Sequence, residues 1–332
     1  MAKHSLRNLR NYRKSTTNQM LGVWPKVVKI FEKLWEVLKA REIFQNWLSA
    51  TIKYILWKSG ILKTNCIEVK CASGGGVCIE PEFYGRIIRG YYHGYLKNVE
   101  CNGDHIVLNG IRVLAKPRFN GRYWDFGFAR FIRFRDVVLE EFIKQPYSLA
   151  DYRERVVLDV GAYVGDSSIY FALRGAKNVY ALEPHPIAYQ EMVENIRLNG
   201  MEDKIIPINA ALASKPGIVR INVDIEQTTG TLYKPQDFTE GVYKVNAMTL
   251  EQLINNYNIK PDILKMDCEG CEFDIVINDQ EHIKLFKELI IEYHEDEKHH
   301  LIDILNILRE EYNCRVIKEK ESVGIMYCVK KR

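Results

Sequence analysis

The feature that most constrains the fold is residues 156–184, where an apolar run, a glycine turn, an amphipathic segment and a second apolar run follow one another. Residues 156–158 are uninterrupted apolar residues, as in a strand buried on both faces of a parallel sheet. Gly161 and Gly165 bracket a tight turn, and a helical pattern follows that ends at Gly175. This order predicts a strand, turn, helix, strand unit of a doubly wound α/β sheet.

The turn indicates which ligand such a unit would bind. The dinucleotide fingerprint G-x-G-x-x-G is absent, and Asp159 at the strand end would repel a phosphate and favour an ammonium group. Glu183 stands 22 positions after Gly161, about the spacing that places a carboxylate against a ribose. S-adenosylmethionine (SAM) has an ammonium group, a ribose diol and no phosphate, so it suits these residues better than NAD or ATP. A βαβ unit without a ligand is the alternative.

Two sequence blocks carry a resemblance to the FkbM family of SAM-dependent methyltransferases. The first family block, D-x-G-A-x-x-G-x-x-S followed by E-P, is matched by Asp159, Gly161, Ala162, Gly165, Ser168, Glu183 and Pro184. The second, L-K-x-D-x-E-G-x-E, is matched by Leu264, Lys265, Asp267, Glu269, Gly270 and Glu272. Thr249, Leu250 and the strand at 290–294 extend the similarity, which covers about residues 150–330. Tyr163 departs from the family, which often has Asn at this position in the turn.

The resemblance implies a doubly wound, Rossmann-like class I methyltransferase sheet that uses SAM. The predicted cofactor-binding residues are Asp159, Gly161, Ala162, Gly165, Ser168, Glu183 and Asn209. Asn209 is included because it ends a predicted strand at 204–209, where open α/β sheets bind their ligands; a turn asparagine is the alternative.

Acidic residues also end the predicted strands at 262–267 and 288–293, which places Asp267, Glu269, Glu292 and His294 at the edge that carries Asp159. A carboxylate or imidazole there can take the proton of an attacking hydroxyl, so the predicted catalytic residues are Asp267, Glu269 and His294. Two acids could instead hold a divalent cation, which we do not favour, and no metal ligand is predicted. An exposed position in the charged run 292–300 is the alternative for His294. The lone C-x-x-C pair, Cys268 and Cys271, makes zinc or redox chemistry improbable.

Composition changes divide the chain into four predicted parts: a basic flexible tail (1–20), an amphipathic helical segment (21–63), a β-rich accessory domain (64–150) and the methyltransferase domain (151–332). Residues 1–60 carry a net charge of +9, whereas the whole chain has a net charge of +4. The remaining residues therefore have a net charge of about −5. Tryptophans beside lysines in the helical segment could lie in a membrane interface, although a helix packed on protein is favoured. No apolar run reaches the length that spans a bilayer.

Other patterns fill in the remaining chain. Asn109-Gly110 predicts a hairpin turn, and residues 314–329 predict a closing antiparallel hairpin. The long insertion at residues 227–241 predicts a lid or substrate loop. The arginines and aromatic residues of 119–135 could stack on sugars or bases, with a domain interface as the favoured alternative. Eight scattered cysteines and no apparent secretory signal predict a reduced, cytoplasmic protein rather than a disulfide framework.

The predicted function is SAM-dependent O-methylation of a sugar, glycan or glycolipid, since the family is known to modify hydroxyls on sugars and polyketide-like metabolites. The basic N-terminus leaves peripheral membrane or partner binding open, on the cytoplasmic face. A nucleic-acid methyltransferase is a second hypothesis, but no N-P-P-[YF] signature is present, so a nucleic-acid partner is not expected. A non-catalytic scaffold is a third, opposed by the acids and glycines of both blocks.

Overall fold

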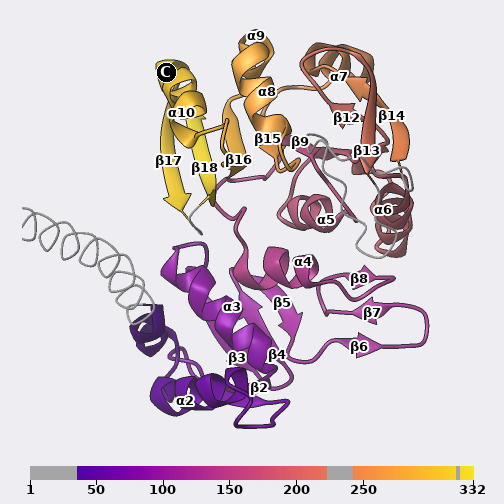
Figure 1. The fold of residues 1–332 in the computed structure, drawn as a ribbon. Coiled ribbons are helices and arrows are strands. Elements are labelled where there is room, and N and C mark those ends of the chain that lie inside the picture. Colours follow the sequence, from indigo (N-terminus) through magenta and orange to yellow (C-terminus); the bar gives the residue numbers. More distant parts are fainter. Residues whose placement is uncertain (1–35, 223–241, 319–321) are drawn as a thin grey trace, which may run out of the picture. The chain divides into compact units, whose positions relative to one another are not determined.

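The computed structural model describes residues 36–222, 242–318 and 322–332. The chain divides into two compact units, the first ending at Asn109 and the second beginning at Gly110, and each is described by itself (Figure 1). The predicted tail (1–20) and the predicted lid (227–241) lie outside the described residues. The predicted domain boundaries after 20, 63 and 150 stay predictions.

The first unit is a small α+β assembly. Its elements are a helical stretch at 36–43, α2 (Trp47–Lys58), β1 (Ile67–Lys70), β2 (Gly76–Ile79), α3 (Pro81–Tyr92), β3 (Val99–Asn102) and β4 (His105–Leu108). Strands β1 and β2 pair antiparallel, as do β3 and β4. On α2, the Thr51 hydroxyl lies 2.7 Å from the Tyr84 hydroxyl, and the Phe44 and Tyr84 rings stack at 5.6 Å. Phe44 and one face of α2 therefore pack on protein, while Leu48, Ile52 and Ile55 of the same helix are exposed, and membrane or partner contact stays a prediction.

The cysteines differ from the sequence expectation. All eight are joined in four disulfides: Cys66–Cys78 and Cys71–Cys101 in the first unit, Cys268–Cys271 and Cys314–Cys328 in the second. The expectation of reduced thiols was wrong, because cysteines that look scattered in the sequence meet in the fold: two pairs across a β-hairpin, one pair within a tight loop, and Cys71–Cys101 between the end of β1 and strand β3. Disulfides persist mainly in oxidising compartments, so the cytoplasmic location stays a prediction with this observation against it.

A seven-stranded sheet forms the centre of the second unit. Its strands, in spatial order, are β11 (Ile205–Ile208), β10 (Asn178–Leu182), β9 (Val156–Val160), β15 (Ile263–Met266), β16 (Glu288–His294), β18 (Val323–Lys330) and β17 (Tyr312–Lys318). The first five are parallel, and β17 and β18 close the sheet as an antiparallel hairpin. The predicted class I methyltransferase sheet and its closing hairpin are confirmed. The strand order reverses between β9 and β15, the switch point where such sheets bind ligands.

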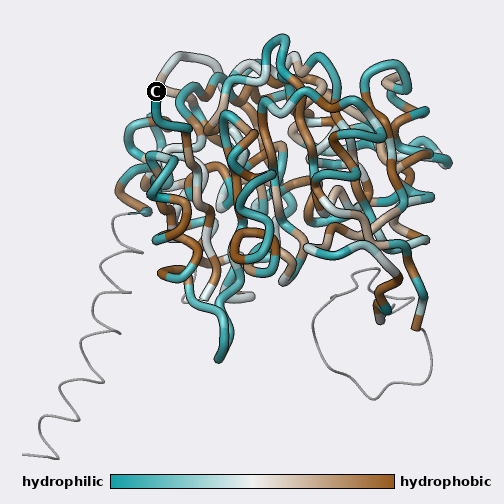
Figure 2. Tube along the Cα trace, turned by 90° about the horizontal axis from the view of Figure 1, so that it is seen from above, coloured by the Kyte–Doolittle hydropathy of each residue, from teal (hydrophilic) through white to brown (hydrophobic). Residues whose placement is uncertain are grey.

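Helices cover this sheet because its strands alternate their side chains between two faces. The helices are α5 (Asp166–Leu173), α6 (Pro186–Leu198), α7 (Leu250–Tyr257), α8 (Cys271–Asn278), α9 (Gln280–Ile283) and α10 (Leu301–Glu311). Val156, Leu158 and Val160 point into one apolar core shared with α7, α8 and α10, while α5 packs against β9, β10 and β11. Along the chain, hydrophobic stretches alternate with hydrophilic ones, as the tube in Figure 2 shows.

Smaller elements complete the second unit. They are β5 (Ile111–Leu114), β6 (Arg118–Phe119), β7 (Trp124–Asp125), β8 (Arg130–Phe131), α4 (Asp136–Leu139), a π-helical turn (Glu140–Lys144), β12 (Ala211–Leu212), β13 (Gly217–Asn222) and β14 (Val242–Met248). The arginine-rich segment around β8 lies against α6, where the Asn199 amide bonds both the N–H and the carbonyl of Arg130 at 2.9 and 2.8 Å. This contact is of the interface kind favoured for residues 119–135. Among the described residues, no helix is both long and apolar enough to cross a membrane.

Candidate functional site

The glycine turn after β9 is shaped by its backbone. The N–H groups of Gly161 and Ala162 both donate to the carbonyl of Leu182 at 3.0 Å, which ties the turn to the end of β10. Gly161 has φ +74°, and a Cβ there would overlap with the carbonyl oxygen of Asp267. Gly165, with φ +85°, is the N-cap residue of α5. A glycine is thus required at position 161 for two reasons: its φ is positive, and its backbone lies close to the loop after β15.

Asp159 lies beneath this turn rather than at its surface. Its carboxylate is fully buried and accepts hydrogen bonds from Ser167 Oγ at 2.7 Å and Ser168 Oγ at 2.6 Å. The ammonium of Lys265 lies 3.0 Å from Asp159 Oδ1 and donates to the carbonyl of Gly161 at 2.8 Å. The ammonium group expected beside Asp159 is therefore supplied by the protein itself, and Asp159 and Ser168 support the turn from inside.

Glu183 is placed at the end of β10, as predicted. Its two carboxylate oxygens accept backbone N–H groups of Tyr163 and His185, both at 2.8 Å. Burial raises the pKa of Glu183 to about 7, against the lowering effect of these two hydrogen bonds. Asn209 lies beside it and donates to the Glu183 carbonyl at 2.9 Å, with an exposed side chain. Glu183, Asn209 and the turn thus meet at one edge of the sheet.

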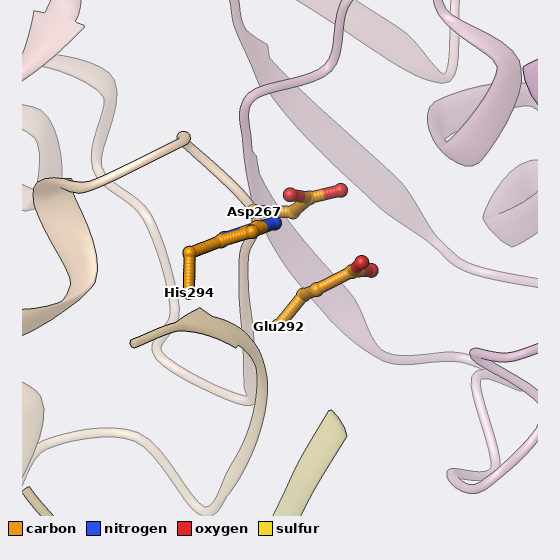
Figure 3. Close-up of side chains that lie close together, drawn as sticks. All are labelled: Asp267, Glu292 and His294. Carbon is orange, nitrogen blue, oxygen red and sulfur yellow. The ribbon is translucent and has the colours of Figure 1, made fainter. Parts of the chain in front are cut away.

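At the same edge, Asp267, Glu292 and His294 converge (Figure 3). One ligand atom from each lies within 4.8 Å of the others, although Asp267 follows β15 and the other two come from β16. The Tyr147 hydroxyl spans the two acids, 3.0 Å from Asp267 Oδ2 and 3.3 Å from Glu292 Oε2. The structure therefore joins two of the three predicted catalytic residues, and Glu292, predicted at this edge but given no role, completes the cluster.

Glu269, the third predicted catalytic residue, lies on the exposed loop before α8, with φ +56°. The neighbouring acid Glu272 is fully buried instead, and its carboxylate accepts the N–H groups of Cys268 at 2.8 Å and Gly270 at 2.9 Å. This bonding fixes the loop that carries Asp267. Glu269 is not one of the three residues whose ligand atoms converge, although its charge helps to raise the pKa of His294.

The electrostatics of the cluster follow from its crowding of acids. Burial raises the pKa of Asp267, against the lowering effect of Lys265 and His294. For His294, burial acts to lower the pKa, but the neighbouring carboxylates of Glu272 and Asp267 raise it to about 9. The imidazole is therefore protonated at neutral pH in the unliganded protein.

Three residues near this edge were given no role from the sequence. Tyr147 is a lone aromatic residue in an irregular stretch, and Glu141 lies in the π-helical turn, a rare element often found at functional sites. Lys265 belongs to the second family block, whose pattern marks it without showing that it pairs with Asp159. Each depends on contacts between segments that are far apart in sequence.

Comparison with known proteins identifies the domain that contains this site. The family model described as the Methyltransferase FkbM domain matches residues 159–316. The hexuronic acid methyltransferase AglP of Haloferax volcanii is 25% identical over 140 residues, 42% of this chain and 56% of that protein. A ribosomal protein L11 methyltransferase of Geobacter sp. strain M21 is 44% identical over 61 residues, 18% of this chain and 20% of that protein.

Solved structures with a related fold include M. jannaschii TYW2 in complex with AdoMet, with a TM-score of 0.36 and 20% identity over 63% of this chain and 84% of that one. The chain spans only 20% to 56% of the length of the two curated relatives named above. The predicted resemblance is confirmed by the family match, which contains the glycine turn, Glu183, Asp267 and His294. Residues 159–316 of the chain therefore form a Methyltransferase FkbM domain.

Proposed function

We propose that this protein is a SAM-dependent O-methyltransferase that transfers a methyl group to a hydroxyl of a sugar, glycan or glycolipid. The family match supports methyl transfer, and a sugar acceptor is supported by the similarity to a relative named as a hexuronic acid methyltransferase. That relative is only 25% identical over the matched part. The chemistry of the site supports a hydroxyl acceptor, and the sugar class rests on this similarity and on the family resemblance.

One observation carries the proposal, namely that Asp267 belongs to both halves of the site. Its carbonyl packs against Gly161 of the glycine turn, and its carboxylate belongs to the cluster with Glu292 and His294. A methyl donor seated on the turn and a hydroxyl acceptor at the cluster would therefore be neighbours, as an in-line transfer requires.

The cofactor side would be formed by the turn and the ends of β10 and β11. Glu183 has two carboxylate oxygens anchored by backbone N–H groups, and it is the group that would accept hydrogen bonds from the ribose hydroxyls. Asn209, with its exposed amide beside Glu183, would face the base. When bound, SAM supplies a methyl group on a positively charged sulfonium, which is electrophilic without further activation.

On the acceptor side, Asp267 would take the proton of the attacking hydroxyl as the new C–O bond forms and the C–S bond breaks. Its position supports this role, since Tyr147 holds one carboxylate oxygen at 3.0 Å. The positive charge of the His294 imidazolium would offset the negative charge of the neighbouring carboxylates while Asp267 is ionised. A base held within hydrogen-bond distance contributes roughly 100-fold to 10,000-fold in rate.

Labelled SAM distinguishes the acceptor classes. The full chain is incubated with methyl-labelled SAM and with host extract separated into glycan, lipid, protein and nucleic-acid fractions. The proposal expects SAM-dependent label in glycan or glycolipid, released as a methyl ether of a sugar after acid hydrolysis. Label confined to RNA or DNA would replace it with the nucleic-acid hypothesis.

A further inference from the structure

The cluster of Asp267, Glu292 and His294 has the composition of a metal site. Glu292 and His294 stand two residues apart on β16, so both side chains leave the strand on the same face. Asp267 reaches them from the end of the neighbouring parallel strand β15. Figure 3 shows the three side chains pointing toward one another, and a ligand atom from each lies within 4.8 Å of the others.

The supporting contacts are those of a built site rather than of loose surface acids. The Tyr147 hydroxyl is 3.0 Å from Asp267 Oδ2 and 3.3 Å from Glu292 Oε2, and Tyr147 is itself buried. A hydroxyl has one proton, so it can donate to only one of these acids at a time. Hydrogen bonds that orient metal-binding carboxylates in this way are common around metal ions.

A second observation indicates that a cation belongs here. Among the described residues, one carboxylate oxygen each of Glu141 and Asp166 is buried without a hydrogen-bond partner, and His294 Nδ1 is buried with Glu272 Oε1 at 3.8 Å, beyond hydrogen-bond distance. The side chains of Glu141 and Asp166 are more than nine-tenths buried, and they interact electrostatically with Glu292 and Asp267 respectively. The nearby ammonium of Lys265 is held by Asp159 and by the Gly161 carbonyl.

The donor set selects the kind of ion. Two carboxylates are hard oxygen ligands, and one imidazole adds a nitrogen that Mg²⁺ takes less readily than Mn²⁺ or Zn²⁺. Three ligands leave positions open on an octahedral ion, where water or an acceptor oxygen can bind. We propose that Asp267, Glu292 and His294 form a binding site for a divalent cation of the Mn²⁺ class, which would replace the imidazole proton of His294 as the positive charge among the acids.

Only the role of the ion rests on the proposed function: a bound cation would lower the pKa of an acceptor hydroxyl and ease its loss of a proton to a carboxylate. Binding of the ion is a separate property of the chain. It can therefore be measured without SAM and without an acceptor.

The test is a titration of the chelator-treated full chain with Mn²⁺, followed by the loss of the free-ion electron paramagnetic resonance signal. We expect one Mn²⁺ per chain, with affinity at least tenfold weaker in Glu292→Gln and in His294→Gln. Tyr147→Phe should weaken binding about tenfold, because it removes the hydroxyl that orients one or the other of the two carboxylates. Asp296→Asn is the matched control, since Asp296 Oδ1 lies 3.0 Å from His299 Nδ1 in an exposed carboxylate–histidine pair of the same chain.

Each variant is first checked for its circular dichroism spectrum, so that a misfolded chain is not scored. Absence of stoichiometric binding of Mn²⁺, Mg²⁺ or Zn²⁺ to the folded wild type would overturn the proposal, and so would unchanged binding in the Gln variants. Full methyl transfer in excess chelator, with no ion bound, would show that the ion takes no part in transfer and would leave the proposed function standing; the binding titration alone decides whether the site exists. Tight Mn²⁺ binding by a chain that transfers no methyl group would support the metal site and contradict the proposed function.

Discussion

Gly161 and Asp267 lie in backbone contact across the switch point of the sheet, so close that any side chain on Gly161 would overlap with the carbonyl of Asp267. The contact joins the turn after β9 to the loop after β15, which places the predicted cofactor residues beside the acidic cluster. A change at Gly161 should therefore disturb both.

Gly161→Ala should be far more harmful than the same change at another glycine with positive φ. It combines a left-handed conformation, about 1 to 2 kcal/mol for a residue with a Cβ, with a backbone overlap that cannot relax by a rotamer change. Gly200→Ala is the control, since Gly200 has φ +63° but an added Cβ meets nothing within 4 Å. Chemical denaturation should show a loss of about 1 kcal/mol for Gly200→Ala and of more than about 3 kcal/mol for Gly161→Ala. Equal losses would contradict the close approach.

Glu183 should make SAM binding depend on pH around neutrality. Burial raises its pKa to about 7, and ribose hydroxyls donate to the charged carboxylate, so SAM affinity should rise as pH increases from about 6 to 8. Calorimetry of Glu183→Gln should show weaker binding, by about 1.5 to 3 kcal/mol, with that pH dependence removed. The exposed Glu202→Gln is the control. If SAM binding by Glu183→Gln still depends on pH, the dependence comes from another titratable group.

The same group should affect the stability of the protein without ligand. Between its ordinary pKa near 4.5 and its folded value of about 7, Glu183 holds a proton in the folded state and not in the unfolded state. The free energy of unfolding should therefore fall as pH rises through this window, by about 3 kcal/mol at most, and level off above it. Urea denaturation at pH 5 and pH 8 measures the change, which Glu183→Gln should reduce and Glu202→Gln should not.

The disulfide Cys71–Cys101 should stabilise the first unit. It closes a loop of 30 residues, for which the loss of chain entropy in the unfolded state gives about 3 to 4 kcal/mol. The double variant Cys71→Ser with Cys101→Ser should unfold at lower urea, and a reducing agent should shift the wild type in the same direction. Mass spectrometry after alkylation without reduction should find no free thiol. Alkylation of all eight cysteines in the native protein would restore the expectation of a reduced chain.

The basic N-terminus and helix α2 should respond differently to truncation. Removal of residues 1–35 should leave the melting temperature unchanged and abolish binding to anionic vesicles. Each Lys or Arg near such a surface contributes about 1 kcal/mol to binding, and added salt weakens this attraction. Removal of residues 1–63 should also lower the melting temperature, because Thr51 and Phe44 pack on Tyr84. Vesicle binding that persists after removal of residues 1–35 would locate membrane affinity elsewhere in the chain.

The sequence was sufficient to predict the sheet, because its buried strands, its glycine turn and its helices follow local patterns. It also placed Asp267 and His294 at one edge, since parallel strands end on the same side. It did not reveal the Lys265–Asp159 ion pair, whose residues are 106 positions apart. Nor did it reveal that the Tyr147 hydroxyl lies between two acids that are 120 and 145 positions away in the sequence. Disulfide pairing was missed for another reason: three of the four pairs are only 3, 12 and 14 positions apart, and spacing alone does not show which cysteines a hairpin or a loop brings together. Glu269 was given a role and Glu292 was not, because a position in a motif does not show which side chains converge.

Asp267→Asn tests the central claim most directly, since Asp267 is proposed to take the acceptor proton beside the cofactor turn. The measurement pairs calorimetric SAM affinity with the rate of methyl transfer from labelled SAM into the identified carbohydrate acceptor, using the exposed Asp203→Asn as the control. We expect SAM affinity to change less than about threefold while the transfer rate falls about 100-fold or more. A variant that binds SAM and transfers methyl groups at close to the wild-type rate would contradict the assignment of Asp267.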